Sequence, residues 1–159
     1  MLATPPAQDA LDARTLVLSR LFRASPAQVY AAWTDPEALP RWFGPEGWSC
    51  ETHAMDLRVG GEWRFTMSGH GMSFPNRHRW TALVPPEDGR EGRIEFLMDG
   101  LDGDEPKAVA VRLSPEGTGT RLTQTMVFPS AEAVAVARSY QAEARGQETL
   151  TKLARALGE

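Results

Sequence analysis

Apolar and polar residues alternate along most of the chain, and this pattern predicts a sheet of six to seven strands. Between residues 14 and 22, Leu16 and Leu18 fall on one side while Val17 and Leu21 fall on the other. Such alternation is typical of a strand, because successive side chains point to opposite faces. Six later segments have a similar strand-like pattern: 48–57, 61–68, 76–84, 92–99, 106–114 and 119–128.

Short segments rich in Gly, Pro and Asp separate the later strands, at 59–61, 69–71, 85–89, 99–104 and 115–117. Parallel strands need a long crossover connection, whereas antiparallel strands can be joined by a tight turn. We therefore expect neighbouring strands to pair antiparallel.

Helical signals lie before and after this run of strands. Ser25 followed by Pro26 is typical of a helix start and predicts a short helix over 26–34. A second short helix is predicted from Asp35 to the Gly-Pro pair at 44–45. Ser130 then caps a helix that could run unbroken to residue 157, interrupted only by a glycine at 146.

The order of these elements favours an α+β fold. A sheet with one apolar face has to bury that face against another layer. The C-terminal helix is the largest element available, so we expect a curved antiparallel sheet wrapped around it, with the two short helices closing one end. We expect one domain over 13–159, preceded by a flexible arm over 1–12.

Composition narrows the classes of function and the compartment. The net charge is −4 with a pI of about 5.4, which argues against nucleic-acid binding because phosphate contacts need clustered Lys and Arg. Cys50 is the single cysteine, so no intrachain disulfide is expected and a reducing compartment is the simplest interpretation. No signal peptide or apolar run long enough for a membrane helix is found, so we expect a cytoplasmic protein without membrane contact.

Strand alternation selects the residues expected on the inner face of the sheet. They are rich in aromatic and Met side chains, which adapt to irregular shapes and suit a binding surface. The same residues could instead pack the core, and the pattern leaves both interpretations open. The candidates for ligand binding in the sheet are Trp63, Phe65, Met67, His78, Trp80, Phe96, Met98 and Val111.

The C-terminal helix adds polar candidates. At 100° per residue, Tyr140, Glu143 and Gln147 fall in the same arc as Val136 and Leu150. A carboxylate within an apolar stripe is costly unless it is paired or solvated, so Glu143 predicts a ligand, a water or a buried partner there. A slight roll of the helix would instead leave Glu143 in water. Tyr140, Glu143 and Gln147 complete the set of expected ligand-binding residues.

Several motifs together resemble a known family, and the likeness extends over residues 14–157. They are Arg41-Trp42-Phe43-Gly44-Pro45, the segments 56–61 and 63–65, the stretch 21–36 and the closing stretch 150–157. In this order they are similar to the activator of heat-shock-protein-90 ATPase homologue-like proteins of the START-like (polyketide cyclase and lipid-transport) superfamily. The resemblance implies a helix-grip fold with a cavity between the sheet and the long helix.

The resemblance leaves the activity open, because one fold hosts many functions. The superfamily includes ligand carriers, cyclases, hydrolases and chaperone co-factors. Many relatives have Gly-Trp in the last helix where this chain has Gly146-Gln147, and an aromatic Tyr is common where this chain has Trp80. Both departures imply an altered ligand preference.

Our leading hypothesis is the binding of a small hydrophobic or amphipathic molecule, by a carrier, sensor or sequestering protein. The alternative is an acid–base enzyme that cyclises, dehydrates or isomerises a polyketide-like or aromatic compound, with Glu143 as base and His78 or Tyr140 as proton donor. A chaperone co-factor is the third reading. Homodimerisation through an exposed strand edge stays open.

No metal or cofactor is expected. The three histidines, His53, His70 and His78, lack the spacing of a zinc site, which needs three or four ligands. The nucleophile elbow Gly-x-Ser-x-Gly of many hydrolases is absent from the sequence.

Overall fold

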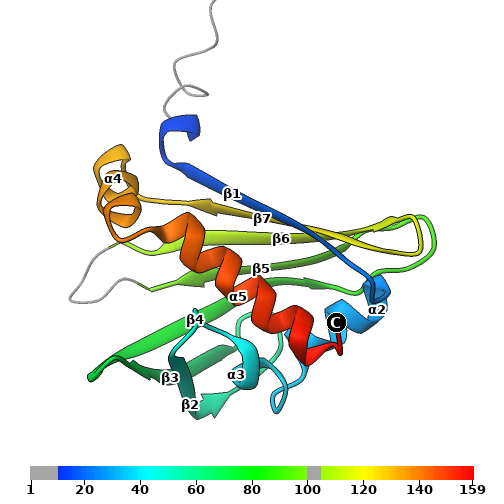
Figure 1. Cartoon of the computed structure of the whole chain (residues 1–159), viewed down its shortest axis with the longest axis horizontal. Coiled ribbons are helices and arrows are strands. Elements are labelled where there is room, and N and C mark those ends of the chain that lie inside the picture. Colours follow the sequence, from blue (N-terminus) through cyan, green and yellow to red (C-terminus); the bar gives the residue numbers. More distant parts are fainter. Residues whose placement is uncertain (1–10, 100–104) are drawn as a thin grey trace, which may run out of the picture.

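The computed structural model describes residues 11–99 and 105–159. Its seven strands form one antiparallel sheet in the order β1-β7-β6-β5-β4-β3-β2 (Figure 1). The strands are β1 (Thr15–Phe22), β2 (Trp48–Met55), β3 (Glu62–Gly69), β4 (Met72–Val84), β5 (Gly92–Met98), β6 (Lys107–Glu116) and β7 (Gly119–Val127). The helices are α2 (Pro26–Thr34), α3 (Leu39–Trp42), α4 (Ala131–Ser139) and α5 (Ala142–Ala156).

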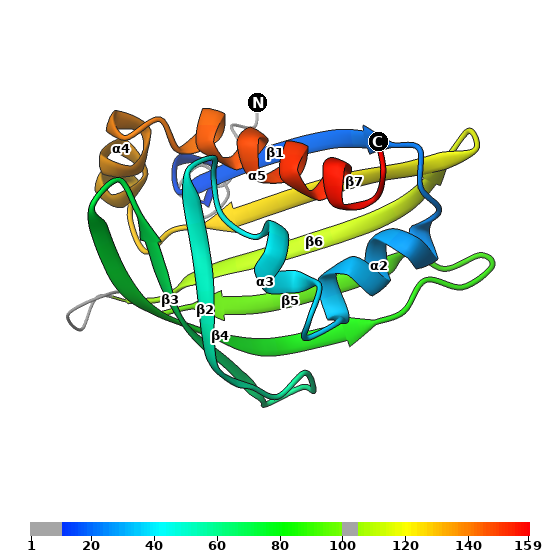
Figure 2. The ribbon, with the colours of Figure 1, turned by 60° about the horizontal axis from the view of Figure 1, so that its bottom comes forward.

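The predicted α+β architecture is confirmed. Helices α2, α3 and α5 lie on the same face of the sheet, and α4 lies at one end of it (Figure 2). We call the face of the sheet that α2, α3 and α5 cover the inner face. The predicted strands are found with shifts of a few residues at most, the largest at β4, which begins at Met72 rather than residue 76. His70 and Gly71, with φ of 52° and 77°, form the two-residue turn that allows this longer hairpin.

Local signals explain the two short helices. The Ser25 hydroxyl accepts the Gln28 backbone N–H, and the Gln28 side chain accepts the Ser25 N–H, so a full capping box begins α2. The second helix is only one turn long, over Leu39–Trp42. The Trp42 ring N–H donates to the Ala32 carbonyl at 3.1 Å, which fastens α3 to α2.

The prediction of one unbroken C-terminal helix is wrong. Ser130 does cap a helix, through the Ala133 N–H at 3.1 Å, but α4 ends at Ser139. Gln141 adopts a left-handed conformation with φ of 61°, and α5 starts after it in a new direction. The residue that breaks the helix is therefore Gln141 and not Gly146.

Gly146 has a packing role. A Cβ built at this position would lie 2.3 Å from Cδ1 of Leu18, which is buried in β1. Any side chain at this position would require Leu18 to move, so glycine allows α5 to lie close against β1. At its far end, the Glu159 carboxylate accepts the backbone N–H groups of Arg23 and Ala24 at 2.9 Å each, so the C-terminus is tied to the start of α2.

The main core lies between the inner face and the helices α2, α3 and α5. It joins Val29 and Trp33 of α2 with Leu150 and Leu153 of α5 and with the inward side chains of the strands. A smaller cluster of Leu16, Phe128 and Val134 packs α4 against the ends of β1 and β7. The C-terminal helices are thus held by apolar burial on one face only, as expected for a helix on a sheet.

Some expectations concern residues outside the described ranges. The flexible arm was predicted over 1–12, of which 1–10 lie outside, and so does most of the turn predicted at 99–104. Within the ranges that are described, no helix has both the length and the apolar character needed to span a membrane.

Candidate ligand-binding site

Six rings pack against one another on the inner face, beneath α2 and α3. We call this group the aromatic end: Phe43, Trp63, Phe65, His78, Trp80 and Phe96. Trp63 stacks on Phe65 with centroids 3.7 Å apart, and His78 stacks on Phe96 at 4.7 Å. Phe43 follows α3 and meets His78 edge-on at 5.2 Å. These contacts fill the space between the sheet and the short helices with rings.

His78 is the polar centre of the aromatic end. Its side chain is buried at 1% exposure, and neither ring nitrogen has a hydrogen-bond partner among the residues that the structure describes. Burial lowers the pKa of His78 to about 3, with a further contribution from the charge of Lys107 and an opposing one from Asp99. The ring is therefore neutral near pH 7, with one nitrogen as donor and the other as acceptor.

Two tryptophans in the same region also have buried ring N–H groups. The ring N–H groups of Trp80 and Trp33 are buried and, like the nitrogens of His78, have no hydrogen-bond partner within the described part of the chain. Trp33 lies on α2 and its ring is 6.2 Å from that of Phe96, so both belong to the same neighbourhood as His78. Buried polar groups nearly always find a partner, and each exception needs an explanation such as a water or a ligand.

A different set of side chains covers the inner face towards α4. We call it the lysine end: Met98, Lys107, Gln124, Met126 and Phe128. The register aligns His78 with Met98 and Met98 with Lys107, so these three side chains lie on one face in a row across β4, β5 and β6. The Lys107 ammonium lies 5.2 Å from the ring centroid of Phe128.

The lysine end is less tightly closed than the aromatic end. Four of its side chains are partly exposed, namely Met98, Lys107, Gln124 and Met126. They nevertheless point to the same face of the sheet as Val109 and Val111, which are buried. Burial lowers the pKa of Lys107, and among residues 11–99 and 105–159 no acidic group raises it in return. The inner face therefore carries a half-buried cation in a region that solvent still reaches.

The candidates on the C-terminal helix were misplaced. Tyr140 is 65% exposed, and Glu143 and Gln147 are exposed as well. Glu143 pairs at the surface with Arg138, at 3.1 Å between Oε1 and Nε. The predicted arc assumed a continuous helix, and the left-handed residue at 141 rotates α5 so that a different face is buried. The acid–base pair of Glu143 with the buried His78 is not assembled.

The candidates in the sheet lie where strand alternation predicts. Trp63, Phe65, His78, Trp80, Phe96 and Val111 are buried, while Met67 and Met98 are partly exposed. Their packing into the core is observed, whereas contact with a ligand stays a prediction. Sequence reasoning missed Lys107, Gln124 and Phe43. The signal for Lys107 was available, because it falls in phase with Val109 and Val111 on an otherwise apolar strand face.

The remaining histidines lie apart from the inner face. His53 bonds Thr66 at 2.7 Å on the exposed edge of the sheet, and His70 meets the ring of Trp48 in the β3–β4 turn region. Over residues 11–99 and 105–159, no group of three His, Cys, Asp or Glu side chains lies close enough to hold a metal ion.

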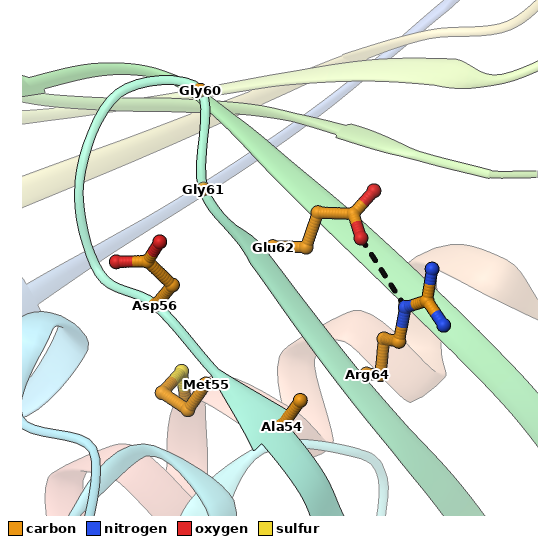
Figure 3. Close-up of a pocket in the computed structure, with 7 residues that line it drawn as sticks. All are labelled: Ala54, Met55, Asp56, Gly60, Gly61, Glu62 and Arg64. Carbon is orange, nitrogen blue, oxygen red and sulfur yellow. Dashed lines mark hydrogen bonds and ion pairs between the residues drawn. The ribbon is translucent and has the colours of Figure 1, made fainter.

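An open groove of about 350 Å³ lies beside the β2–β3 connection (Figure 3). Its walls come from Ala54, Met55, Asp56, Gly60, Gly61, Glu62 and Arg64. Glu62 and Arg64 form an ion pair at 3.2 Å, and they alternate with Trp63, so they face away from the aromatic end. This groove belongs to the outer surface and differs from the predicted cavity.

Comparisons with known proteins agree with the architecture. A protein from Chromobacterium violaceum is 28% identical with a TM-score of 0.71, over 89% of this chain and 96% of its own. An Arthrobacter aurescens protein is 23% identical with a TM-score of 0.80, over 93% and 88% of the two chains. The AHSA1 protein from Silicibacter pomeroyi is 24% identical with a TM-score of 0.67, over 91% and 97%. A search of curated proteins found no match.

The seven-stranded antiparallel sheet and the C-terminal helix that crosses its inner face define a START-like, helix-grip protein. The family model described as "Activator of Hsp90 ATPase homolog 1-like protein" matches residues 23–158. The chain therefore belongs to that family, and the resemblance inferred from the motifs is confirmed. The fold is compatible with ligand binding in a cavity, without specifying a ligand.

Proposed function

We propose that this protein binds a small hydrophobic or amphipathic molecule between the inner face of the sheet and the C-terminal helices, as a carrier, sensor or sequestering protein. The observation that carries the proposal is a set of buried polar atoms that have no partner among the described residues: both ring nitrogens of His78 and the ring N–H of Trp80 at the aromatic end, and the ring N–H of Trp33 on the neighbouring α2. Such groups are costly in an apolar interior unless something bonds them. A ligand with one polar group would satisfy part of this need.

The character of the wall supports the same function. Aromatic rings offer large apolar contact areas, and Met side chains adapt their shape to what they contact. Met67, Met98 and Met126 lie on the inner face and are partly exposed, so a ligand meets flexible side chains there. Phe43 contacts His78 edge-on and is the one ring of the aromatic end that is partly exposed.

Calorimetric titration with 2-naphthol, decanol and decanoate tests the proposal, with tryptophan emission as a second readout because Trp63 and Trp80 adjoin His78. We expect saturable binding of at least one probe. His78→Phe keeps a ring of similar size and removes the two nitrogens, so it should weaken 2-naphthol binding about tenfold, the value of one hydrogen bond. His53→Phe, at an exposed histidine, is the matched control and should change nothing. Absence of saturable binding by every probe would contradict the proposal.

The two alternatives remain predictions. An acid–base enzyme would need a base other than Glu143, because that carboxylate is exposed and paired with Arg138. The chaperone co-factor hypothesis rests on the family's name alone. Neither alternative has a contact in the described residues that favours it over ligand binding.

A further inference from the structure

Lysine is rare in this chain, and both lysines have particular surroundings. Of 17 basic residues only Lys107 and Lys152 are lysines. The Lys152 ammonium donates to the backbone carbonyls of Trp48 at 3.1 Å and Pro45 at 3.4 Å. Among the described residues, Lys107 has no comparable oxygen partner, and its ammonium lies against the ring of Phe128. A ring face attracts a cation but leaves its N–H groups without acceptors.

Among the described residues, the charge of Lys107 is therefore poorly compensated. On the outer face, arginines pair closely with carboxylates, as in Arg93 with Glu95 at 2.8 Å. Asp99, the acidic group that acts on His78, is itself bound by Arg77 and Arg79. Burial accordingly lowers the pKa of Lys107. An anion placed beside this ammonium would gain a charge-assisted interaction in a partly desolvated setting, where such contacts are strongest.

The distance between Lys107 and His78 indicates the size of a ligand that would contact both side chains. Met98 separates them in the row across β4, β5 and β6, so their backbones are two strand spacings, roughly 10 Å, apart. The side chains in between and beside them are apolar or flexible, namely Met98, Met126 and Phe96. A molecule that spans this distance would have a body about the size of two fused rings, with an acidic group at the lysine end.

Building on the proposed ligand-binding function, we propose that the ligand is an amphipathic organic anion, with an apolar body on Met98 and the aromatic end and an acidic head group, such as a carboxylate, paired with Lys107. The buried nitrogens of His78 and the ring N–H of Trp80 would then serve a hydroxyl or carbonyl at the opposite end of the ligand. The cation selects the charge of the ligand, and the rings select its shape.

A charge series on one apolar body tests this proposal. The probes are 2-naphthoate, the neutral 2-naphthamide and the cationic 2-naphthylmethylammonium, each titrated calorimetrically into the full chain. We expect wild type to bind 2-naphthoate at least about tenfold more tightly than 2-naphthamide, and to bind the cation most weakly. Lys107→Met keeps an unbranched apolar stem of four heavy atoms, removes the ammonium, and should abolish the preference between the first two probes. Arg112→Met removes a positive charge from the outer face of the same strand and should preserve the preference.

Selective labelling of lysine Cε with carbon-13 gives a second readout, because the chain has two lysines. Saturation with 2-naphthoate should shift the Lys107 signal and leave that of Lys152 in place. If 2-naphthamide binds wild type as tightly as 2-naphthoate, or if Lys107→Met retains the preference, the anion proposal is wrong while ligand binding stands. If wild type binds none of the naphthalene probes, 2-naphthol included, and neither decanol nor decanoate, the proposed function itself fails.

Discussion

The aromatic end and the lysine end lie on the same face of one sheet, yet they are built differently. At the aromatic end the rings contact one another, and Trp63, His78, Trp80 and Phe96 are fully buried. The ring nitrogens of His78 and Trp80 have no partner among the described residues. At the lysine end, Met98, Gln124 and Met126 are partly exposed, and a cation takes the place of a buried apolar side chain. The first region is a buried core that contains polar atoms unpaired among the described residues, and the second is a partly exposed part of the inner face.

Under the proposed function, the two regions would have different roles, one in stability and the other in binding. Interlocking rings have few alternative arrangements and fix the position of α2 and α3. Met side chains on the other side rearrange at little cost. We therefore expect truncation of the rings at the aromatic end to act mainly on the free energy of unfolding, and substitutions at the lysine end to act mainly on ligand affinity. His78 is expected to affect both, because its nitrogens are the groups proposed to bond the ligand.

Truncation of one side chain at each end should separate the two most clearly. Phe96→Ala removes a buried ring that contacts Trp33, His78 and Trp80, and it should lower the free energy of unfolding by about 3–5 kcal/mol. Met126→Ala, at a partly exposed site, should cost less than about 2 kcal/mol. Urea unfolding followed by circular dichroism measures both. Equal losses would remove the distinction between the two ends.

Acid should destabilise the protein through His78. Its pKa is about 3 when folded and about 6.5 when unfolded, so between these values the unfolded chain binds the proton more readily. Stability from this group is thus intact above pH 6.5, falls as the pH drops, and reaches its limit near pH 3. Between pH 6.5 and 4.5 the loss should be about 2 kcal/mol.

The loss is measured as the difference in pH dependence between wild type and His78→Phe, in urea titrations at several pH values. The variant retains every other titrating group, so it provides the reference. A wild-type curve parallel to that of His78→Phe would mean that the ring is protonated in the folded protein or is not buried.

The close approach of α5 to β1 should reverse the usual effect of replacing a helical glycine. Gly→Ala normally stabilises a helix by up to about 1 kcal/mol. At Gly146 the new methyl group would overlap Leu18, so we expect a loss of about 1–2 kcal/mol instead. The same substitution in a Leu18→Ala background, where the overlap is gone, should be neutral or stabilising. Thermal unfolding of the four proteins gives the coupling between the two sites.

Removal of the Lys107 charge should have the smallest effect on stability, and in the opposite direction. Lys107→Met keeps the apolar stem and removes a poorly compensated ammonium, so the ligand-free protein should gain up to about 1 kcal/mol. The measurement is again urea unfolding, with Arg112→Met as the control on the outer face. A clear loss of stability would indicate a structural partner for Lys107 and argue against a ligand-facing role.

Much of the fold could be predicted because strand alternation and turn residues are local signals. The inward set on β3, β4 and β5 follows from period two alone, and the Ser25–Gln28 capping box is visible within four residues. The break at Gln141 could not be predicted this way. The left-handed residue joins α4, which packs on Phe128, to α5, which packs on Leu18. Both are tertiary contacts, and a local sequence pattern does not contain them.

The candidate site was predicted in part for the same reason. Ring-bearing positions stand out in the sequence, but their mutual contacts and the unpartnered nitrogens of His78 appear only when the strands are aligned. Glu143 was misplaced because its face was assigned on a continuous helix. Lys107 stands at the first position of its strand, where a charged side chain is ordinarily solvated, and its phase with Val109 and Val111 is the signal that places it on the inner face.

The location of a bound ligand tests the central claim most directly. Methyl-labelled methionines at positions 67, 98 and 126 report on the inner face, and Met72, which is 51% exposed, reports on the surface. Titration of the labelled protein with 2-naphthoate should shift the Met98 and Met126 signals saturably and leave Met72 unchanged. Shifts at Met72 alone, or no saturable shift at Met98 and Met126, would contradict ligand binding on the inner face.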